Sequence, residues 1–139
     1  VPDFLSLLVT LYKNHKVCKG KFIAHLIKGD ISYICSDKIL LSRILGNLIK
    51  NALEASKSGE TVTVTYKNDT DGIRFIVHNK GFMTENVQLQ LFNRSFSTKG
   101  EKGRGFGTYT VKLLLERYLN GHVEFNSTEK NGTTVTVSL

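Results

Sequence analysis

The sequence predicts a two-layer α/β sandwich in which helices cover one face of a mixed, mostly antiparallel sheet. Two observations support this α+β fold class. Most strand-like segments come in adjacent pairs separated by turn residues, and the segments between those pairs carry apolar residues at helical spacing. A doubly wound parallel sheet would instead alternate single strands with single helices.

Length and composition predict one globular domain over residues 1–139. Hydrophobic residues make up 40% of the chain and charged residues 22%, with a single proline, which excludes a disordered tail and a collagen-like repeat. No apolar run approaches the roughly 20 residues that cross a bilayer. No internal repeat or linker-like segment marks a second domain.

Cysteine content and net charge indicate the redox environment of the protein and the charge of its partners, but they do not identify its function. Cys18 and Cys35 match no zinc spacing and are too few for a disulfide scaffold, so we expect a reducing, cytoplasmic environment. The net charge of +7 favours anionic partners. Charge alone does not distinguish a nucleotide from a nucleic acid, a lipid or an acidic protein.

The first part of the chain is expected to form two helices separated by a hairpin. Apolar residues recur at helical spacing over residues 2–13. Strand candidates at 21–26 and 31–35 are separated by a Lys-Gly-Asp turn at 28–30. A serine N-cap opens the most strongly periodic helix, over residues 36–56.

Two further hairpins are predicted in the rest of the chain. The first joins β-branched and apolar strands at 61–67 and 73–77, with turn residues between them. The second joins strands at 122–126 and 133–137 through a turn near Asn131-Gly132. These pairs supply most of the strands of the predicted sheet.

A glycine-rich basic loop at 94–107 is expected between helices at 84–92 and 108–119. Closely spaced glycines let backbone amides approach an anion, and the N-terminus of the next helix adds partial positive charge. The loop therefore predicts phosphate binding. It is not a Walker A loop, because no Gly-Lys-Ser/Thr ends it.

Asn47 and Asn51 lie four residues apart on the strongest helix, so their amides share one face. Taken alone, such a pair is more typical of a solvated polar stripe than of a binding site. Its meaning depends on the motifs that accompany it.

Four segments together resemble, in order, the N, G1, F and G2 boxes of bacterial sensor histidine kinases. They are residues 44–55, 77–83, 91–96 and 103–108, and Gly132-Thr133-Thr134 is similar to the closing Gly-Thr of the same domain. The chain thus resembles the catalytic, ATP-binding domain of these kinases. The resemblance implies the Bergerat or GHKL fold, shared with gyrase, Hsp90 and MutL, and it implies ATP and Mg²⁺ as ligands.

The resemblance also implies roles for individual residues. Asn51 would bind Mg²⁺ through its amide oxygen, with Asn47 beside it, and Asn47 and Lys99 would be the catalytic residues. Gyrase-like ATPases have a water-activating glutamate at the position of Asn47, and because an amide is no general base, this favours a kinase over a hydrolase. The implied nucleotide-binding residues are Asn47, Asn51, Asn79, Gly81, Met83, Phe96, Ser97, Thr98, Lys99, Gly103, Arg104, Gly105, Phe106, Gly107, Thr108, Thr133 and Thr134.

The G1 segment departs from the usual Asp-x-Gly-x-Gly pattern of these kinases. Asn79 stands at the position of the adenine-reading aspartate, and Met83 at that of the second glycine. An uncharged amide makes a weaker hydrogen bond than a carboxylate, so weaker ATP binding is expected. Without the other motifs, Asn79 would be interpreted as an ordinary residue at the end of a strand. Glu54-Ala55 also replaces a Lys-aromatic pair that is common in the N box. Lys50, Lys99 or Arg104 could supply the missing phosphate-binding charge, and Lys99 is the best placed because it belongs to the lid.

The function implied is transfer of the ATP γ-phosphoryl group to a histidine. None of the four histidines is followed by the acidic residue usual at such an acceptor. The expected partners are therefore a histidine-containing dimerisation domain of the same protein and the receiver domain of a response regulator, in a homodimeric parent protein that can carry a membrane anchor.

The alternatives are a GHKL ATPase or protein-serine kinase, a degenerate nucleotide site that mediates protein contacts, and a basic nucleic-acid-binding module. No nucleic acid is expected as a partner, because few aromatic residues accompany the basic loop.

Overall fold

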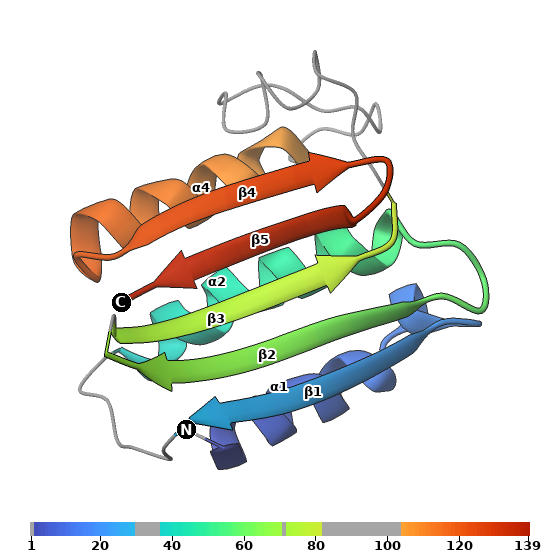
Figure 1. Ribbon diagram of the computed structural model, residues 1–139, viewed down its shortest axis with the longest axis horizontal. Coiled ribbons are helices and arrows are strands. Elements are labelled where there is room, and N and C mark those ends of the chain that lie inside the picture. Colours follow the sequence, from blue (N-terminus) through green and yellow to red (C-terminus); the bar gives the residue numbers. More distant parts are fainter. Residues whose placement is uncertain (1, 30–36, 71, 82–103) are drawn as a thin grey trace.

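A five-stranded mixed sheet forms one layer of the protein. The computed structural model describes residues 2–29, 37–70, 72–81 and 104–139. Strand order across the sheet is β1-β2-β3-β5-β4 (Figure 1). The strand β1 runs parallel to β2, and every other neighbouring pair is antiparallel. The sheet is thus mixed and mostly antiparallel, as predicted, although the parallel pairing of β1 with β2 was not. The strands are β1 (Phe22–Gly29), β2 (Thr61–Asp69), β3 (Gly72–Asn79), β4 (His122–Thr128) and β5 (Gly132–Ser138).

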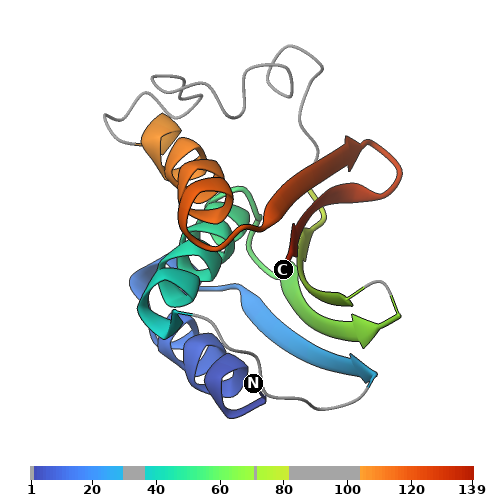
Figure 2. The same ribbon diagram turned by 90° about the vertical axis from the view of Figure 1, so that its left-hand side faces the viewer.

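Helices form the second layer, on one face of the sheet (Figure 2). They are α1 (Pro2–Lys13), α2 (Lys38–Glu54) and α4 (Arg104–Tyr118), with a short 3₁₀ turn η1 (Lys16–Cys18) after α1. The predicted two-layer sandwich is thus confirmed. Among the described helices, none combines the length and apolar character needed to span a membrane.

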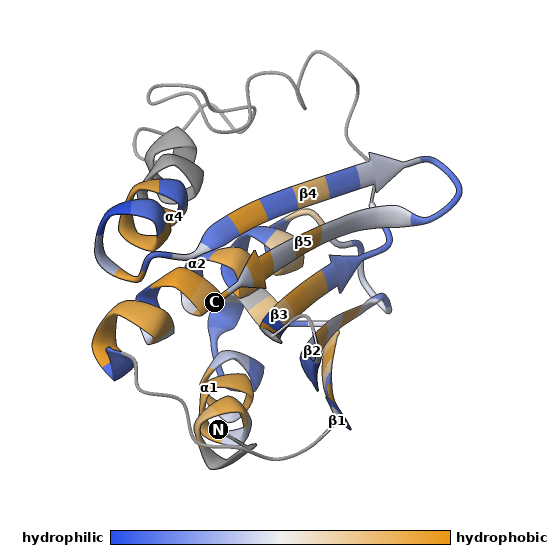
Figure 3. Ribbon diagram, turned by 60° about the vertical axis from the view of Figure 1, so that its left-hand side comes forward, coloured by the Kyte–Doolittle hydropathy of each residue, from blue (hydrophilic) through white to orange (hydrophobic). Residues whose placement is uncertain are grey.

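The core lies between the two layers. All three helices and all five strands contribute buried apolar residues to it. Along β4, hydrophobic and hydrophilic residues alternate, as expected for a strand with one buried face (Figure 3). The largest inward side chains of the sheet are Tyr66 and Phe75, whose ring centroids are 5.6 Å apart. Each fully buried side chain of this size stabilises the fold by about 1.5–3 kcal/mol.

Helix α2 begins at a different cap from the predicted one. Oδ1 of Asp37 accepts hydrogen bonds from the backbone amides of Ile39 (2.9 Å) and Leu40 (3.1 Å), and the predicted cap Ser36 lies outside the described residues. A carboxylate also complements the positive end of the helix dipole, which favours Asp37 at this position. At the other end, Lys21 Nζ donates to the carbonyl oxygen of Leu53 at 2.6 Å, so a cation stabilises the negative end of α2.

The predicted hairpin turn at residues 28–30 is wrong where the structure describes it. Strand β1 continues through Lys28 and Gly29, which pair with Lys67 and Asn68 of β2. Gly29 has φ +89°, and a Cβ there would lie 2.0 Å from the Asn68 carbonyl oxygen, so glycine permits this close approach. The expected partner strand at 31–35 lies outside the described residues.

Helix α4 begins at Arg104, four residues before the predicted start at Thr108. Gly105 and Gly107 therefore belong to its first turn and not to a loop. Glycine has poor helix propensity, so the sequence pattern did not indicate this start. The predicted hairpins β2–β3 and β4–β5 are confirmed, and all four strands are longer than predicted. The helix expected at 84–92 lies outside the described residues.

Candidate functional site

Four segments that carry predicted site residues meet at one end of the sandwich. The last turn of α2, the first turn of α4, the end of β3 and the start of β5 all lie there (Figure 1). Helix α2 contacts both α4 and β3. The topology thus brings together the segments that resemble the N, G1 and G2 boxes and the closing Gly-Thr.

Asn79 is a buried polar residue at the end of β3. Its side chain is only 4% exposed, and it pairs with Thr133 of β5 in the sheet. Among the described residues, no group hydrogen-bonds to its side-chain amide. Neither atom of this amide is fully buried without a partner, since among the described side chains only Arg74 Nε is. The amide can therefore pair with a ligand.

Gly81 allows the end of β3 to approach the end of α2. A Cβ at this position would lie 3.1 Å from Asn79 Nδ2 and 3.1 Å from the carbonyl oxygen of Ala55, just after α2. Both distances are tighter than ordinary van der Waals contact. The absence of a side chain at Gly81 therefore keeps space beside the Asn79 amide.

Thr133 holds this arrangement from β5. Its Oγ1 donates to the carbonyl oxygen of Gly81 at 2.7 Å and lies 2.8 Å from Ser127 Oγ on β4. Gly132, with φ +77°, places its backbone so close that a Cβ would be 2.3 Å from the Asn79 carbonyl oxygen. Thr133 therefore positions Gly81, and its predicted contact with a nucleotide stays a prediction.

Thr134 lies on the other face of the sheet from Asn79 and Thr133. It pairs with His78, and successive strand residues point to opposite faces. The ring of His78 is itself bonded on that side, with Nε2 2.7 Å from the carbonyl oxygen of Asn131. The structure thus does not bring Thr134 to the Asn79 side chain.

Asn47 and Asn51 belong to a helical row that leads to Gly81. Residues 47, 51 and 55 follow one another at four-residue spacing on α2 and its C-cap, and the Ala55 carbonyl oxygen borders Gly81. Both asparagine side chains are half-buried. The two amides are therefore presented along the same side of α2 that reaches the Asn79 region.

The first turn of α4 supplies backbone donors at this end of the molecule. Arg104, Gly105, Phe106, Gly107 and Thr108 form its N-terminal turn. The first amides of a helix have no intrahelical acceptor, and the helix dipole makes this end positive, so it favours an anion. The other predicted ligand residues, Met83, Phe96, Ser97, Thr98, Lys99 and Gly103, lie outside the described residues.

Two supporting residues were missed by sequence reasoning. Tyr12 of α1 packs against Gly46, where a Cβ would lie 2.6 Å from the phenol oxygen, and burial raises the pKa of this phenol. Lys21 caps the carbonyl end of α2. Gly46 inside a periodic helix was a signal for the first contact, whereas no local pattern pointed to Lys21.

Comparisons with known proteins agree with this geometry. Residues 36–139 match the model of the family described as histidine kinase-, DNA gyrase B-, and HSP90-like ATPase. A probable C4-dicarboxylate sensor kinase of Halalkalibacterium halodurans is 36% identical over 135 residues, which cover 89% of this chain and 25% of that protein. The chain spans about a quarter of the length of the curated relatives it matches.

Solved structures show the same fold. The nucleotide-free catalytic domain of the histidine kinase ThkA superposes with a TM-score of 0.85 at 19% identity, over 100% of this chain and 91% of that one. ThkA in complex with the response regulator protein TrrA gives 0.81 at 18% identity, over 100% of this chain and 40% of that one. With the family match over three quarters of its length, this chain belongs to the histidine kinase-, DNA gyrase B- and HSP90-like ATPase family.

Proposed function

We propose that this domain binds ATP with Mg²⁺ and, within a longer sensor histidine kinase, donates the γ-phosphoryl group to a histidine on a separate dimerisation domain. The observation that carries this proposal is the meeting of the Asn47–Asn51 row, the buried Asn79 amide and the N-terminus of α4 at one end of the fold. Each of them could bind a different part of ATP. The asparagine row could bind the metal ion on the triphosphate, Asn79 could bind the base, and the N-terminus of α4 could bind phosphate oxygens.

Each described residue has a role that its chemistry permits. The amide oxygen of Asn51 is a hard ligand that suits Mg²⁺, and Asn47 lies one turn away to orient the same group. Asn79 would hydrogen-bond to the base, beside the space that Gly81 leaves. The amides of the first turn of α4 would bind phosphate oxygens. Magnesium, when bound, would neutralise charge on the triphosphate.

The residue chemistry favours phosphoryl transfer to a protein over hydrolysis. Asn47 carries an amide, which cannot take a proton from water, so an attacking water is not activated at this position. Catalysis would then depend on positioning and charge neutralisation, with Lys99 as the proposed lid cation. Steady ATP turnover by the isolated chain would instead favour the alternative of a GHKL ATPase.

The proposed partners follow from the relatives. The related structure of ThkA with TrrA supports a response-regulator receiver domain as the protein that accepts the phosphoryl group from the histidine. The phosphoacceptor would lie on a histidine-containing dimerisation domain of the same protein, and the parent would be a homodimer. The cytoplasm is the proposed location of this domain.

Isothermal titration with a non-hydrolysable ATP analogue, with and without Mg²⁺, tests the site. We expect Asn51→Ala to lower the affinity for the Mg²⁺ complex at least tenfold and to abolish the difference that Mg²⁺ makes, because the metal loses its amide ligand. Asn126→Ala is the matched control, since this exposed amide lies on the sheet face away from the helices. Unchanged Mg²⁺-dependent affinity in Asn51→Ala would contradict the assignment.

A further inference from the structure

The side chain of Asn79 has a property that a carboxylate at this position would lack. A carboxylate only accepts hydrogen bonds, whereas an amide has an accepting oxygen and a donating nitrogen of nearly equal size. The Asn79 side chain is 4% exposed, and no described group bonds to its amide and so selects one orientation. Rotating the amide by half a turn would exchange donor and acceptor with little change in packing.

The two purines present opposite patterns on the edge that such a residue reads. Adenine offers its 6-amino group as a donor and N1 as an acceptor, whereas guanine offers O6 as an acceptor and N1–H as a donor. One orientation of an amide complements adenine, and the reversed orientation complements guanine. A carboxylate complements the adenine amino group but faces guanine O6 with a second acceptor, which is repulsive.

From this we infer that the base pocket accepts guanine nucleotides as well as adenine nucleotides, with Asn79 as the residue that determines this tolerance. The inference rests on the proposed function, because it assumes that a nucleotide base lies against Asn79. The amide can take either orientation because Gly81 contributes no side chain beside it, and no described group hydrogen-bonds to it.

The test is a comparison of Mg²⁺ complexes of non-hydrolysable ATP, GTP and CTP analogues by isothermal titration with the 139-residue chain. We expect the dissociation constants of the ATP and GTP analogues to agree within about tenfold, and the smaller CTP base to bind more weakly than both. Asn79→Asp is expected to weaken the GTP analogue at least tenfold relative to the ATP analogue, since an unsatisfied or repulsive polar contact typically has an effect of this size. Asn126→Asp, which makes the same chemical change on the outer face of the sheet, should leave the ratio unaltered.

The outcomes separate this inference from the proposed function. If the native chain binds the ATP analogue and prefers it over the GTP analogue more than a hundredfold, the purine tolerance is wrong and the proposed function stands. If Asn79→Asp folds, as judged by circular dichroism, and leaves the ratio unchanged, Asn79 is not the discriminating residue. If the native chain binds neither analogue, both proposals fail. The native ratio decides the question even if the variant does not fold.

Discussion

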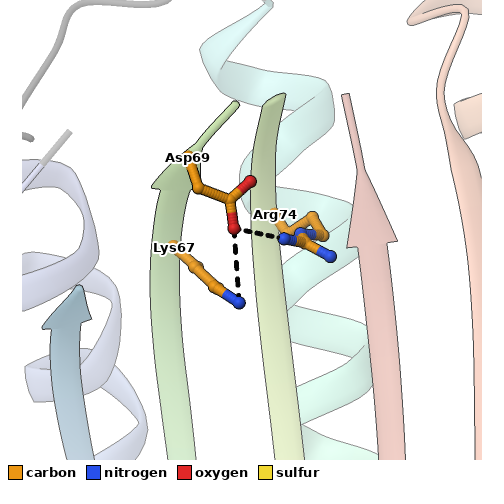
Figure 4. A network of polar contacts seen from close by, with 3 residues as sticks. All are labelled: Lys67, Asp69 and Arg74. Carbon is orange, nitrogen blue, oxygen red and sulfur yellow. Dashed lines mark hydrogen bonds and ion pairs between the residues drawn. The ribbon is translucent and has the colours of Figure 1, made fainter. Parts of the chain in front are cut away.

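The polar side chains at the two ends of the β2–β3 hairpin differ in whether they bind other described residues. At the turn end, Asp69 Oδ2 lies 2.5 Å from Arg74 Nη2 and 3.3 Å from Lys67 Nζ, so the charges there pair with one another (Figure 4). At the open end, Asn79 is buried beside Gly81 with no described partner for its amide. The same pair of strands thus carries an ion-pair network at one end, where Arg74 Nε alone among the described side-chain atoms is buried without a hydrogen-bond partner. At the other end it carries an amide that no described group binds.

The ion pairs at the turn end add little to stability. The side chains of Lys67, Asp69 and Arg74 are 26–41% exposed, and ion pairs with such exposure contribute at most about 1 kcal/mol. The Asn79 amide has no described partner, so a ligand could hydrogen-bond to it. Three substitutions test the contrast, from the largest expected effect to the smallest.

The largest effect is expected at the close backbone approach that supports the open end. Gly132→Ala should lower the free energy of unfolding by about 3 kcal/mol or more, because a Cβ 2.3 Å from the Asn79 carbonyl oxygen must displace backbone, and φ +77° strains any other residue. Urea unfolding measures this. Gly59→Ala is the control, since Gly59 has φ +87° but nothing within 4 Å of its Cβ, so only the conformational strain of about 1 kcal/mol should appear. Equal losses in the two variants would contradict the role of close contact.

An intermediate effect is expected from Thr133→Val. This change removes the hydroxyl that bonds to Gly81 and Ser127, while it keeps the shape, and should lower the free energy of unfolding by about 1–2 kcal/mol. Because Gly81 then loses its anchor, we also expect affinity for an ATP analogue to fall about threefold to tenfold.

The neighbouring residue on the opposite sheet face is the control for that experiment. Thr134→Val should change the free energy of unfolding by less than about 0.5 kcal/mol and leave nucleotide affinity unaltered. If Thr134→Val weakened nucleotide binding as much as Thr133→Val, the division of the two threonines between faces would not explain the site.

The smallest effect is expected at the turn end. Asp69→Asn should lower the free energy of unfolding by at most about 1 kcal/mol at low salt, and less at 1 M salt, because screening already weakens exposed ion pairs. Affinity for the ATP analogue should not change. Loss of nucleotide affinity in this variant would show that the two ends of the hairpin are coupled. It would contradict the view that only the open end contributes to binding.

Local patterns were sufficient for most of the elements but not for their exact limits. The apolar periodicity of α2 and the paired strands on both sides of their turns are local signals, and the structure has these elements. The start of α4 was missed because Gly105 and Gly107 have poor helix propensity and so weaken the helical signal. The parallel partner of β1 was missed because β2 lies more than thirty residues further along the chain.

The sequence by itself determined which chemical groups are available: two amides four residues apart in an apolar-periodic segment, an asparagine at the end of a strand, and a glycine-rich segment beside a further apolar helix. Only the tertiary structure decided which of these groups meet. Side chains along a strand alternate between the two faces of the sheet. Because Asn79 pairs with Thr133, Thr133 lies on the face of the site and Thr134 on the opposite face. That register depends on contacts between β3 and β5, which are more than fifty residues apart in sequence, so no local pattern contains it.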